Sequence, residues 1–200
     1  MVRAIIKPKH IKKKQLVSEQ NHKLTEYFNI RKSDRRTKRE VLEEKRRLIE
    51  FALRKGVEDG LEVKYSENKG RGVFATREFV KGEFVVEYSG ELIDIHEAYI
   101  REQRYEKDEN MGCYMYYFKF KEQHYCLFNF SIDATEETGR LGRLVNHSRN
   151  GNLQTKTILV DSIPRLILTA KTYIRPGEEL LYDYGDRSKE SLEHHPWLAL

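Results

Sequence analysis

The sequence predicts one mainly β domain with a few short helices, preceded by an amphipathic helix and a basic tail. The chain has 200 residues, 38% of them hydrophobic, which allows one ordinary domain with a core. After about residue 60 the sequence changes to short β-rich runs separated by glycine turns, with few helical patterns between them. Many short strands and few helices predict a β-rich fold with irregular connections.

Residues 1–33 are polar and basic and show no sustained periodicity, so we expect them to be mostly disordered. The formal net charge is +5, and the basic excess lies early in the chain. A basic arm ahead of a folded domain suits a nucleic-acid or chromatin surface, and a solvated tail without a partner explains it equally well. The basic residues are Lys7, Lys9, Lys12, Lys13, Lys14, Arg31, Lys32, Arg35, Arg36, Lys38 and Arg39.

Three segments of the chain predict helices. Residues 34–56 form an amphipathic pattern with Gly56 as a stop, and we expect this helix to dock on the core. Asp94 is placed to cap a helix that begins at the next residue, with Glu97 completing a capping box. A short helix over 136–145 is expected to lead into an Asn-His pair. The apolar stripe of the first helix consists of Val41, Leu42, Leu48, Ile49, Ala52 and Leu53.

Five runs beyond the first helix predict strands because they are rich in β-branched and aromatic residues. Turn residues at 81–82 and 175–178 separate some of these runs. The predicted strands are 72–76, 83–93, 113–120, 165–171 and 179–185.

The chain shows no sign of secretion or of a membrane span. It has neither an apolar leader nor a long apolar run. We therefore expect an intracellular protein with reduced thiols and no membrane contact.

The pair Asn146-His147 ends an apolar strip, and three kinds of chemistry compete for it. It could ligate a metal, supply the base of a nucleophile triad, or bind a ligand by hydrogen bonds alone. Cys113 and Cys126 are the only cysteines, and neither Cys-x-x-Cys nor His-x-x-x-His spacing occurs, so no metal site is predicted. No Gly-x-Ser-x-Gly motif occurs either, although Cys113 stays open as a thiol. The hydrogen-bonding role is favoured by elimination.

Two glycines in the stretch 68–76, Gly70 and Gly72, allow the backbone to approach a ligand closely. The stretch lacks the lysine of a phosphate-binding loop and does not open a helix as a dinucleotide-binding motif does. Taken alone, it reads more simply as an ordinary turn before a strand.

Tyr182 and Tyr184 alternate in sequence, so they project to one face if the segment is extended. Tyrosines in strands commonly do no more than pack against a core. Several phenols around one pocket would instead form a narrow aromatic channel that suits a cationic amine or sulfonium ligand. The tyrosines that could join these two are Tyr88, Tyr114, Tyr116 and Tyr117.

Five motifs, in order, resemble the SET-domain protein lysine methyltransferases: KGRGVFAT, FVVEYSGELI, GCYMYYF, RLVNHS and EELLYDYGD. The likeness runs from about Gln20 to Leu200. Within the family, GCYMYYF, IDATEETGRLGRLVNHS and the C-terminal tail are most similar to enzymes that monomethylate lysine 20 of histone H4. The resemblance implies the SET fold, with small curved sheets and a pseudoknot-like C-terminus, over 57–187. Residues 188–200 would close the cofactor pocket.

The resemblance also implies S-adenosylmethionine as cofactor and gives it a set of binding residues. The backbone of one loop would cradle the cofactor, and the Asn-His pair would hydrogen-bond it at the adenine end. A tyrosine would lie against it, and a C-terminal tryptophan would pack on the adenine. The corresponding residues are Lys69, Gly70 and Arg71 in the loop, then Tyr114, Asn146, His147 and Trp197.

The implied catalytic residues are mostly tyrosines. Tyr184 corresponds to the tyrosine beside the sulfonium and the transferred methyl, while Tyr88 and Cys113 would line the lysine channel. Tyr182 stands where the family carries either Tyr or Phe, and a phenol there leaves room for only one methyl group. Asp186 is expected to dock the basic tail of histone H4 on the nucleosome, in the nucleus and on the chromosome.

A second resemblance lies in the tail. Residues 21–32 are similar to the box that binds the proliferating-cell clamp PCNA, including the version that marks a protein for destruction. Asn21 stands where glutamine is usual, and Glu26 stands where the destruction signal prefers aspartate. The residues expected to contact PCNA are Leu24, Tyr27 and Phe28.

Five residues at 127–131, LFNFS, are additional to the pattern of the most similar enzymes. They fall at or beside a strand, so they predict either a register slip or a looped-out bulge. An active, monomeric enzyme is the favoured interpretation. The alternatives are a catalytically weak module that binds chromatin and PCNA, and a methyltransferase for non-histone lysines.

Overall fold

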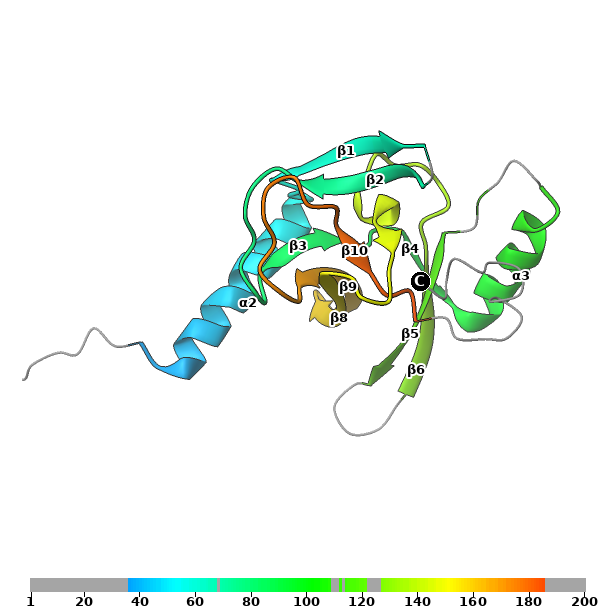
Figure 1. Cartoon of the computed structure of the whole chain (residues 1–200). Coiled ribbons are helices and arrows are strands. Elements are labelled where there is room, and N and C mark those ends of the chain that lie inside the picture. Colours follow the sequence, from blue (N-terminus) through cyan, green and yellow to red (C-terminus); the bar gives the residue numbers. More distant parts are fainter. Residues whose placement is uncertain (1–35, 68, 109–111, 113, 122–126, 186–200) are drawn as a thin grey trace, which may run out of the picture.

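The computed structural model describes residues 36–67, 69–108, 112, 114–121 and 127–185. Their strands form four small sheets, with strand orders β1-β2, β3-β9-β8, β4-β6-β5 and β10-β7 (Figure 1). This confirms the predicted mainly β class with few helices. The strands are β1 (Leu61–Ser66), β2 (Gly70–Ala75), β3 (Phe84–Glu87), β4 (Glu91–Asp94), β5 (Met115–Lys121), β6 (Leu127–Asp133), β7 (Asn146–His147), β8 (Leu153–Val160), β9 (Ile163–Ala170) and β10 (Leu181–Tyr182).

The main core lies between β2, β3 and β9. In β9 the residues from Leu166 to Ala170 are all buried, and all of them except Thr169 are apolar. Phe79 and Ile174, which form an isolated antiparallel bridge, are completely buried in the same core. Full burial of each such side chain contributes about 1.5–3 kcal/mol. The sheets therefore give the site a rigid base.

Two short strands far apart in sequence meet as a parallel pair. Asn146 pairs with Leu181, and His147 pairs with Tyr182. The close approach requires Gly151, because a Cβ there would lie 2.3 Å from the Leu181 carbonyl oxygen. The strand predicted over 179–185 is thus limited to two residues, and it brings the Asn-His pair beside the C-terminal tyrosines.

The strand predicted over 83–93 is wrong, because β3 and β4 belong to different sheets. The chain turns at Gly90, where a Cβ would lie 2.3 Å from the Asp133 carbonyl oxygen. The helix expected over 136–145 is also wrong: only the 3-10 turn η1 (Gly142–Leu144) forms. Gly142 packs directly on β3, with a Cβ position 2.0 Å from the Glu87 carbonyl oxygen.

Helix α2 (Lys38–Lys55) has the predicted stop, with Gly56 at φ 61°, and a full capping box at Thr37. It docks on the core only at its C-terminal end, where Leu53 is buried beside Val160 and Ile167. The rest of the helix projects away from the sheets (Figure 1). Leu42 and Leu48 of the predicted stripe are 70% and 63% exposed, so the expected docking holds for the last turns alone.

Helix α3 (Ile95–Tyr105) begins where the sequence predicts. The Asp94 carboxylate accepts hydrogen bonds from the backbone N–H groups of His96 and Glu97, both at 2.9 Å. The Glu97 carboxylate pairs with Arg101 instead of closing the expected capping box. Of the helices that the structure describes, none is long and apolar enough to cross a membrane.

The additional residues 127–131 lie within β6. This strand pairs with β5 without a register break, from Met115 opposite Asp133 to Lys121 opposite Leu127. Neither the register slip nor the bulge occurs. The extra residues lengthen the β5-β6 hairpin, which extends away from the other sheets (Figure 1). Their in-register pairing leaves the strand end that faces the tyrosines in place.

Candidate active site

Four tyrosines from separate elements form one continuous aromatic cluster. Ring centroids lie 5.7 Å apart for Tyr88 and Tyr116, 6.1 Å for Tyr116 and Tyr182, and 4.7 Å for Tyr182 and Tyr184. Tyr88 follows β3, Tyr116 lies on β5, and the other two lie on and after β10. Tyr116 is a member that sequence reasoning grouped with the others but gave no role. Its alternation with Tyr114, just before β5, was the available signal.

Three of these phenols have fixed hydroxyl groups. Tyr88 donates to the Tyr114 carbonyl oxygen at 3.0 Å, Tyr116 to the Thr155 hydroxyl at 3.2 Å, and Tyr184 to the Val145 carbonyl oxygen at 2.9 Å. For the Tyr182 hydroxyl the structure gives no hydrogen-bond partner among the described residues.

Tyr182 and Tyr184 are neutral at physiological pH. Burial raises the pKa of Tyr182 well above its ordinary value, and the neighbouring Tyr88 adds to the effect. Burial likewise raises the pKa of Tyr184. Both groups can therefore donate or accept hydrogen bonds, but neither is a base near neutral pH.

His147 is held by the segment that carries Tyr184. The backbone N–H of Tyr184 donates to His147 Nδ1 at 3.1 Å, and the two rings meet edge to face at 5.0 Å. Because Nδ1 already accepts this backbone hydrogen bond, the geometry supports a role in which the histidine positions a ligand and does not react. No group of three or more potential metal ligands occurs among the residues that the structure describes.

The side-chain amide of Asn146 is fixed by two hydrogen-bond acceptors from different segments of the chain. Its Nδ2 donates to the Arg71 carbonyl oxygen at 3.2 Å and to Glu179 Oε1 at 3.0 Å. Glu179 Oε2 also pairs with the Lys69 ammonium at 3.2 Å. Arg71 of the predicted cofactor loop thus contacts Asn146 directly, and Lys69 contacts it through Glu179. Glu179 was missed, because an acidic residue just before β10 carries no local signal of this role.

The loop at Gly70 has an open backbone. Gly70 adopts φ 71°, which favours glycine, and a Cβ there would meet nothing within 4 Å. Gly72 is the opposite case, since a Cβ there would lie 2.9 Å from Asn146 Nδ2 and 3.0 Å from Glu179 Oε1. The first glycine leaves room for a ligand, and the second allows the Asn146-Glu179 pair to pack on the backbone.

Arg143 is a buried cation that sequence reasoning also missed. Its guanidinium lies 3.9 Å above the Tyr114 ring, and its Nε donates to the Ala134 carbonyl oxygen at 2.6 Å. Its Nη1 is buried without a hydrogen bond, 3.9 Å from Glu137. Arg71 pairs with the same glutamate. Beside Tyr114, Arg143 thus has one buried N–H group, at Nη1, without a hydrogen bond among the described residues.

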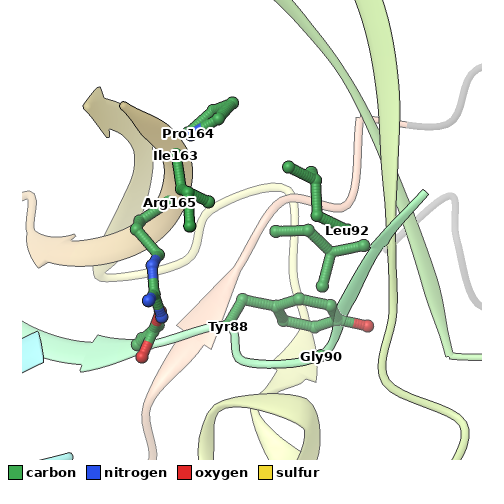
Figure 2. Close-up of a pocket in the computed structure, with 8 residues that line it drawn as sticks. Tyr88, Gly90, Leu92, Ile163, Pro164 and Arg165 are labelled. Atoms are coloured by element: carbon green, nitrogen blue, oxygen red, sulfur yellow. The ribbon is translucent and has the colours of Figure 1, made fainter. Parts of the chain in front are cut away.

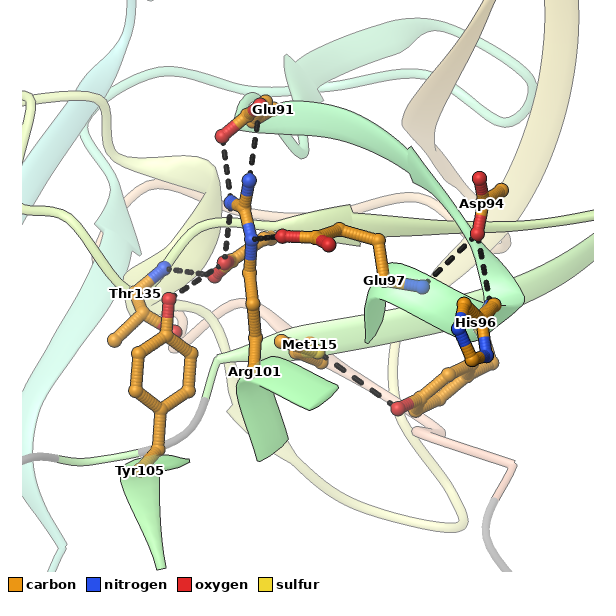
Figure 3. A network of polar contacts seen from close by, with 10 residues as sticks. Glu91, Asp94, His96, Glu97, Arg101, Tyr105, Met115 and Thr135 are labelled. Atoms are coloured by element: carbon orange, nitrogen blue, oxygen red, sulfur yellow. Dashed lines mark hydrogen bonds and ion pairs between the residues drawn. The ribbon is translucent and has the colours of Figure 1, made fainter. Parts of the chain in front are cut away.

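A polar network links α3 to Thr135 (Figure 3), and Thr135 in turn contacts Tyr114. The buried Asp133 carboxylate accepts from Arg101 Nη1 at 3.1 Å, from the Tyr105 hydroxyl at 2.8 Å and from the Thr135 backbone N–H at 3.0 Å. Thr135 Oγ1 in turn accepts from the Tyr114 backbone N–H at 3.2 Å. Burial acts to raise the pKa of Asp133, but the hydrogen bonds from Thr135, Tyr105 and Arg101 outweigh it and lower the pKa.

A hollow of about 200 Å³ lies behind Tyr88 (Figure 2). The Tyr88 ring forms part of its wall, and the hydroxyl points away from Arg165. The buried Glu87 pairs with Arg165 at 3.0 Å and with Arg140 at 3.2 Å, so its charge is compensated. The lining residues are Glu87, Tyr88, Gly90, Leu92, Ile132, Ile163, Pro164 and Arg165.

Several predicted residues lie outside the described part of the chain and stay predictions. They are Cys113 of the lysine channel, Asp186 and Trp197, and Leu24, Tyr27 and Phe28 of the PCNA box. The same holds for the tail at 1–33 and the closing segment at 188–200.

The family model for the SET domain matches residues 70–185, which is more than half of the chain and contains every described site residue except Lys69. The chain belongs to the SET-domain family. SET-domain methyltransferases use S-adenosylmethionine as methyl donor. The fold and family predicted from the five motifs are therefore confirmed.

Named relatives of this SET domain come from several animals. The chain is 59% identical to histone-lysine N-methyltransferase Set8 of Drosophila melanogaster, over 90% of this chain and 25% of that protein. It is 52% identical to N-lysine methyltransferase KMT5A-A of Danio rerio, over 90% and 51%. It is 43% identical to histone-lysine N-methyltransferase set-1 of Caenorhabditis elegans, over 90% and 73%. The chain spans only about a quarter to a half of the first two relatives.

A solved structure shares the fold. CpSET8 from Cryptosporidium superposes with a TM-score of 0.65 at 40% sequence identity, covering 73% of this chain and 67% of that one. The sheets described above are thus those of a SET domain.

Proposed function

We propose that this protein transfers one methyl group from S-adenosylmethionine to a histone lysine, lysine 20 of histone H4. The observation that carries the proposal is the tyrosine cluster, which contacts His147 through Tyr184 and in which the Tyr182 hydroxyl has no hydrogen-bond partner among the described residues. Such a cluster forms an aromatic wall for an alkyl amine beside a bound cation.

The residues near Gly70, Tyr114 and Asn146 fit the cofactor. The open backbone at Gly70, the unused buried Nη1 of Arg143 and the Asn146 Oδ1, which has no donor among the described residues, all suit a polar ligand. We expect Lys69, Gly70, Arg71, Tyr114, Asn146, His147 and Trp197 to hold it. S-adenosylmethionine supplies a methyl group that is already activated by a sulfonium leaving group.

The protein's own contribution is alignment and exclusion of water. An ammonium has no lone pair, so the target lysine must lose its proton before it can react. Burial among Tyr88, Tyr182 and Tyr184 opposes the charged form of the lysine, because desolvation lowers the pKa of an amine. The raised pKa values of Tyr182 and Tyr184 keep these phenols neutral, so they do not stabilise the ammonium as phenolates would.

Tyr182 limits the reaction to one methyl group in this proposal. Its hydroxyl has no partner among the described residues and is available to the lysine nitrogen, directly or through water. Its position between Tyr116 and Tyr184 leaves little room for a methylated nitrogen to rotate into line.

The choice of substrate and partners rests on the relatives and on sequence resemblance. Relatives named histone-lysine N-methyltransferase support a histone substrate. We propose that Asp186 docks the H4 tail on nucleosomes, in the nucleus, and that the enzyme acts as a monomer. Leu24, Tyr27 and Phe28 would bind PCNA, and the basic tail would contact nucleic acid.

The alternative of a catalytically weak module depended on disruption by residues 127–131. Because β6 keeps its register through this stretch, that argument loses its basis. A methyltransferase for non-histone lysines stays as the second candidate, since the described site contains nothing that reads the residues around the target lysine.

Two measurements test the proposal. Calorimetric titration with S-adenosylmethionine should show saturable binding, whereas no binding favours a non-catalytic module. Nucleosomes incubated with enzyme and labelled cofactor should then carry label on histone H4. Matched nucleosomes with arginine in place of lysine 20 of histone H4 should remain unlabelled. Label retained on these nucleosomes would contradict the assigned target.

A further inference from the structure

We propose that Glu179 is a positioning residue that fixes the Asn146 amide with its carbonyl oxygen turned toward the cofactor. The inference rests on the proposed function, because it assigns a role toward S-adenosylmethionine. It concerns a side chain that does not itself need to touch the cofactor. Glu179 acts through Asn146.

The orientation of the Asn146 amide follows from its neighbours. The two atoms facing one end of the amide are oxygens without hydrogens, the Arg71 carbonyl oxygen at 3.2 Å and Glu179 Oε1 at 3.0 Å. Only the NH₂ end can occupy that place, because an amide oxygen there would face two acceptors. Asn146 Oδ1 must point the other way, and no donor for it occurs among the described residues.

An acceptor is what the cofactor requires at this place. S-adenosylmethionine carries N–H donors on its α-ammonium group and on its adenine amino group. With the amide reversed, Asn146 would present NH₂ to these donors and lose the hydrogen bond. A carboxylate enforces the correct orientation more strongly than a neutral acceptor, since charged hydrogen bonds are the stronger ones.

Lys69 and Gly72 hold Glu179 in this role. The Lys69 ammonium pairs with Glu179 Oε2 and leaves Oε1 for Asn146. Gly72 provides the space, because a Cβ there would lie 2.9 Å from Asn146 Nδ2 and 3.0 Å from Glu179 Oε1. Three residues from two distant segments thus converge on one amide.

The backbone of Glu179 is placed without help from its side chain. Asn152 Nδ2 donates to the Glu179 carbonyl oxygen at 2.8 Å, and Asn152 Oδ1 accepts from the Leu181 N–H at 3.0 Å. Residue 179 also forms an antiparallel bridge with Phe74. A change of the Glu179 side chain should therefore leave β10 and the tyrosines where they are.

The test compares Glu179→Met with Glu178→Met. The neighbouring Glu178 accepts from the Arg175 N–H in the same turn and does not contact Asn146. Calorimetry on each purified protein should show about tenfold weaker S-adenosylmethionine binding for Glu179→Met, the loss expected when one charged hydrogen bond is removed. Glu178→Met should bind as the wild type does. Glu179→Gln, which keeps an oxygen acceptor, should recover most of the affinity.

Kinetics and a second variant complete the test. In Glu179→Met the KM for the cofactor should rise about tenfold, while the KM for an H4 peptide stays unchanged. Should Glu179→Met not fold, Gly72→Ala decides, since its added methyl meets only side-chain ends and displaces the same pair. Unchanged affinity in Glu179→Met or Gly72→Ala, or an equal loss in Glu178→Met, would overturn the inference alone. Absence of binding by the wild type would overturn the proposed function with it.

Discussion

The ring centroids of Tyr182 and Tyr184 lie 4.7 Å apart, yet among the described residues only the Tyr184 hydroxyl has a partner, the Val145 carbonyl oxygen. One phenol of the pair is thus anchored and the other is available. In the proposed function the two therefore have different roles: Tyr184 shapes the channel, and Tyr182 contacts the lysine nitrogen.

Replacing Tyr182 with phenylalanine should raise the number of methyl groups that the enzyme adds. Tyr182→Phe removes one hydroxyl from a buried wall and leaves space beside the nitrogen. We expect dimethylated product from an H4 peptide, where the wild type stops at one methyl. Mass spectrometry of the peptide measures this directly. Tyr65→Phe, at a position 78% exposed, is the control and should behave as wild type. A purely monomethylated product from Tyr182→Phe would refute the role of its hydroxyl.

The methyl-transfer rate should rise with pH through the neutral to alkaline range. The raised pKa values of Tyr182 and Tyr184 keep both phenols protonated there, so the titrating group is the lysine amine. While deprotonation limits the step, kcat/KM for peptide should increase up to about tenfold per pH unit between about pH 7 and 9. Tyr182→Phe should keep this slope. A flat profile, or loss of the slope in Tyr182→Phe, would show that another group controls the reaction.

Gly151→Ala should damage the site through the backbone. The added methyl would lie 2.3 Å from the Leu181 carbonyl oxygen and push β10 away from β7. Such overpacking costs about 1–3 kcal/mol of unfolding free energy. Most of the activity should be lost, because Tyr182 lies on the displaced strand.

Gly139→Ala is the control for this change. Its added methyl meets nothing within 4 Å, and only the φ of 80° costs about 1–2 kcal/mol. Urea unfolding and initial rates should separate the two variants. Equal activity in both would mean that the contact between β7 and β10 does not position the tyrosines.

Asp133→Asn should destabilise the domain by about 1–3 kcal/mol, because it weakens the bonds from Arg101 and Tyr105 to a buried carboxylate. The lowered pKa of Asp133 means that its ionised form stabilises the fold above the ordinary pKa. This contribution is lost as the pH falls through the folded-state pKa. Thermal unfolding between about pH 3 and 7 should therefore show a smaller acid loss in Asp133→Asn than in wild type.

Glu97→Gln is the matched control for the Asp133 network. It removes an exposed partner of the same arginine, and such pairs contribute at most about 1 kcal/mol. A loss as large as that of Asp133→Asn would show that burial of the carboxylate is not what matters.

Sequence reasoning predicted the helix ends that are set by residues close to them in the chain. Gly56 at a left-handed φ and the Asp94 cap mark helix ends by their own chemistry. β8 was missed because the turn that joins it to β9 uses Asp161 and Ser162 at positive φ, without the glycine or asparagine that usually signals such a hairpin. The single strand predicted over 83–93 failed because the bend at Gly90 depends on a distant carbonyl group.

The same distinction holds for the site. Tyr88, Tyr182 and Tyr184 could be predicted, because motif order and alternation place them on facing segments. Glu179 and Arg143 could not, since their roles arise only when β10 and the 3-10 turn fold against the loop at Gly70 and against Tyr114. Charged side chains act here through contacts between distant segments, which a single sequence does not display.

The central claim is that a phenol-lined channel presents one uncharged lysine for a single methylation. The most direct test incubates nucleosomes to completion with enzyme and S-adenosylmethionine and measures the mass of intact histone H4. The account predicts one added methyl group, on lysine 20 of histone H4, with no further increase on longer incubation. Unmodified H4, or H4 carrying two or more methyl groups, would contradict it.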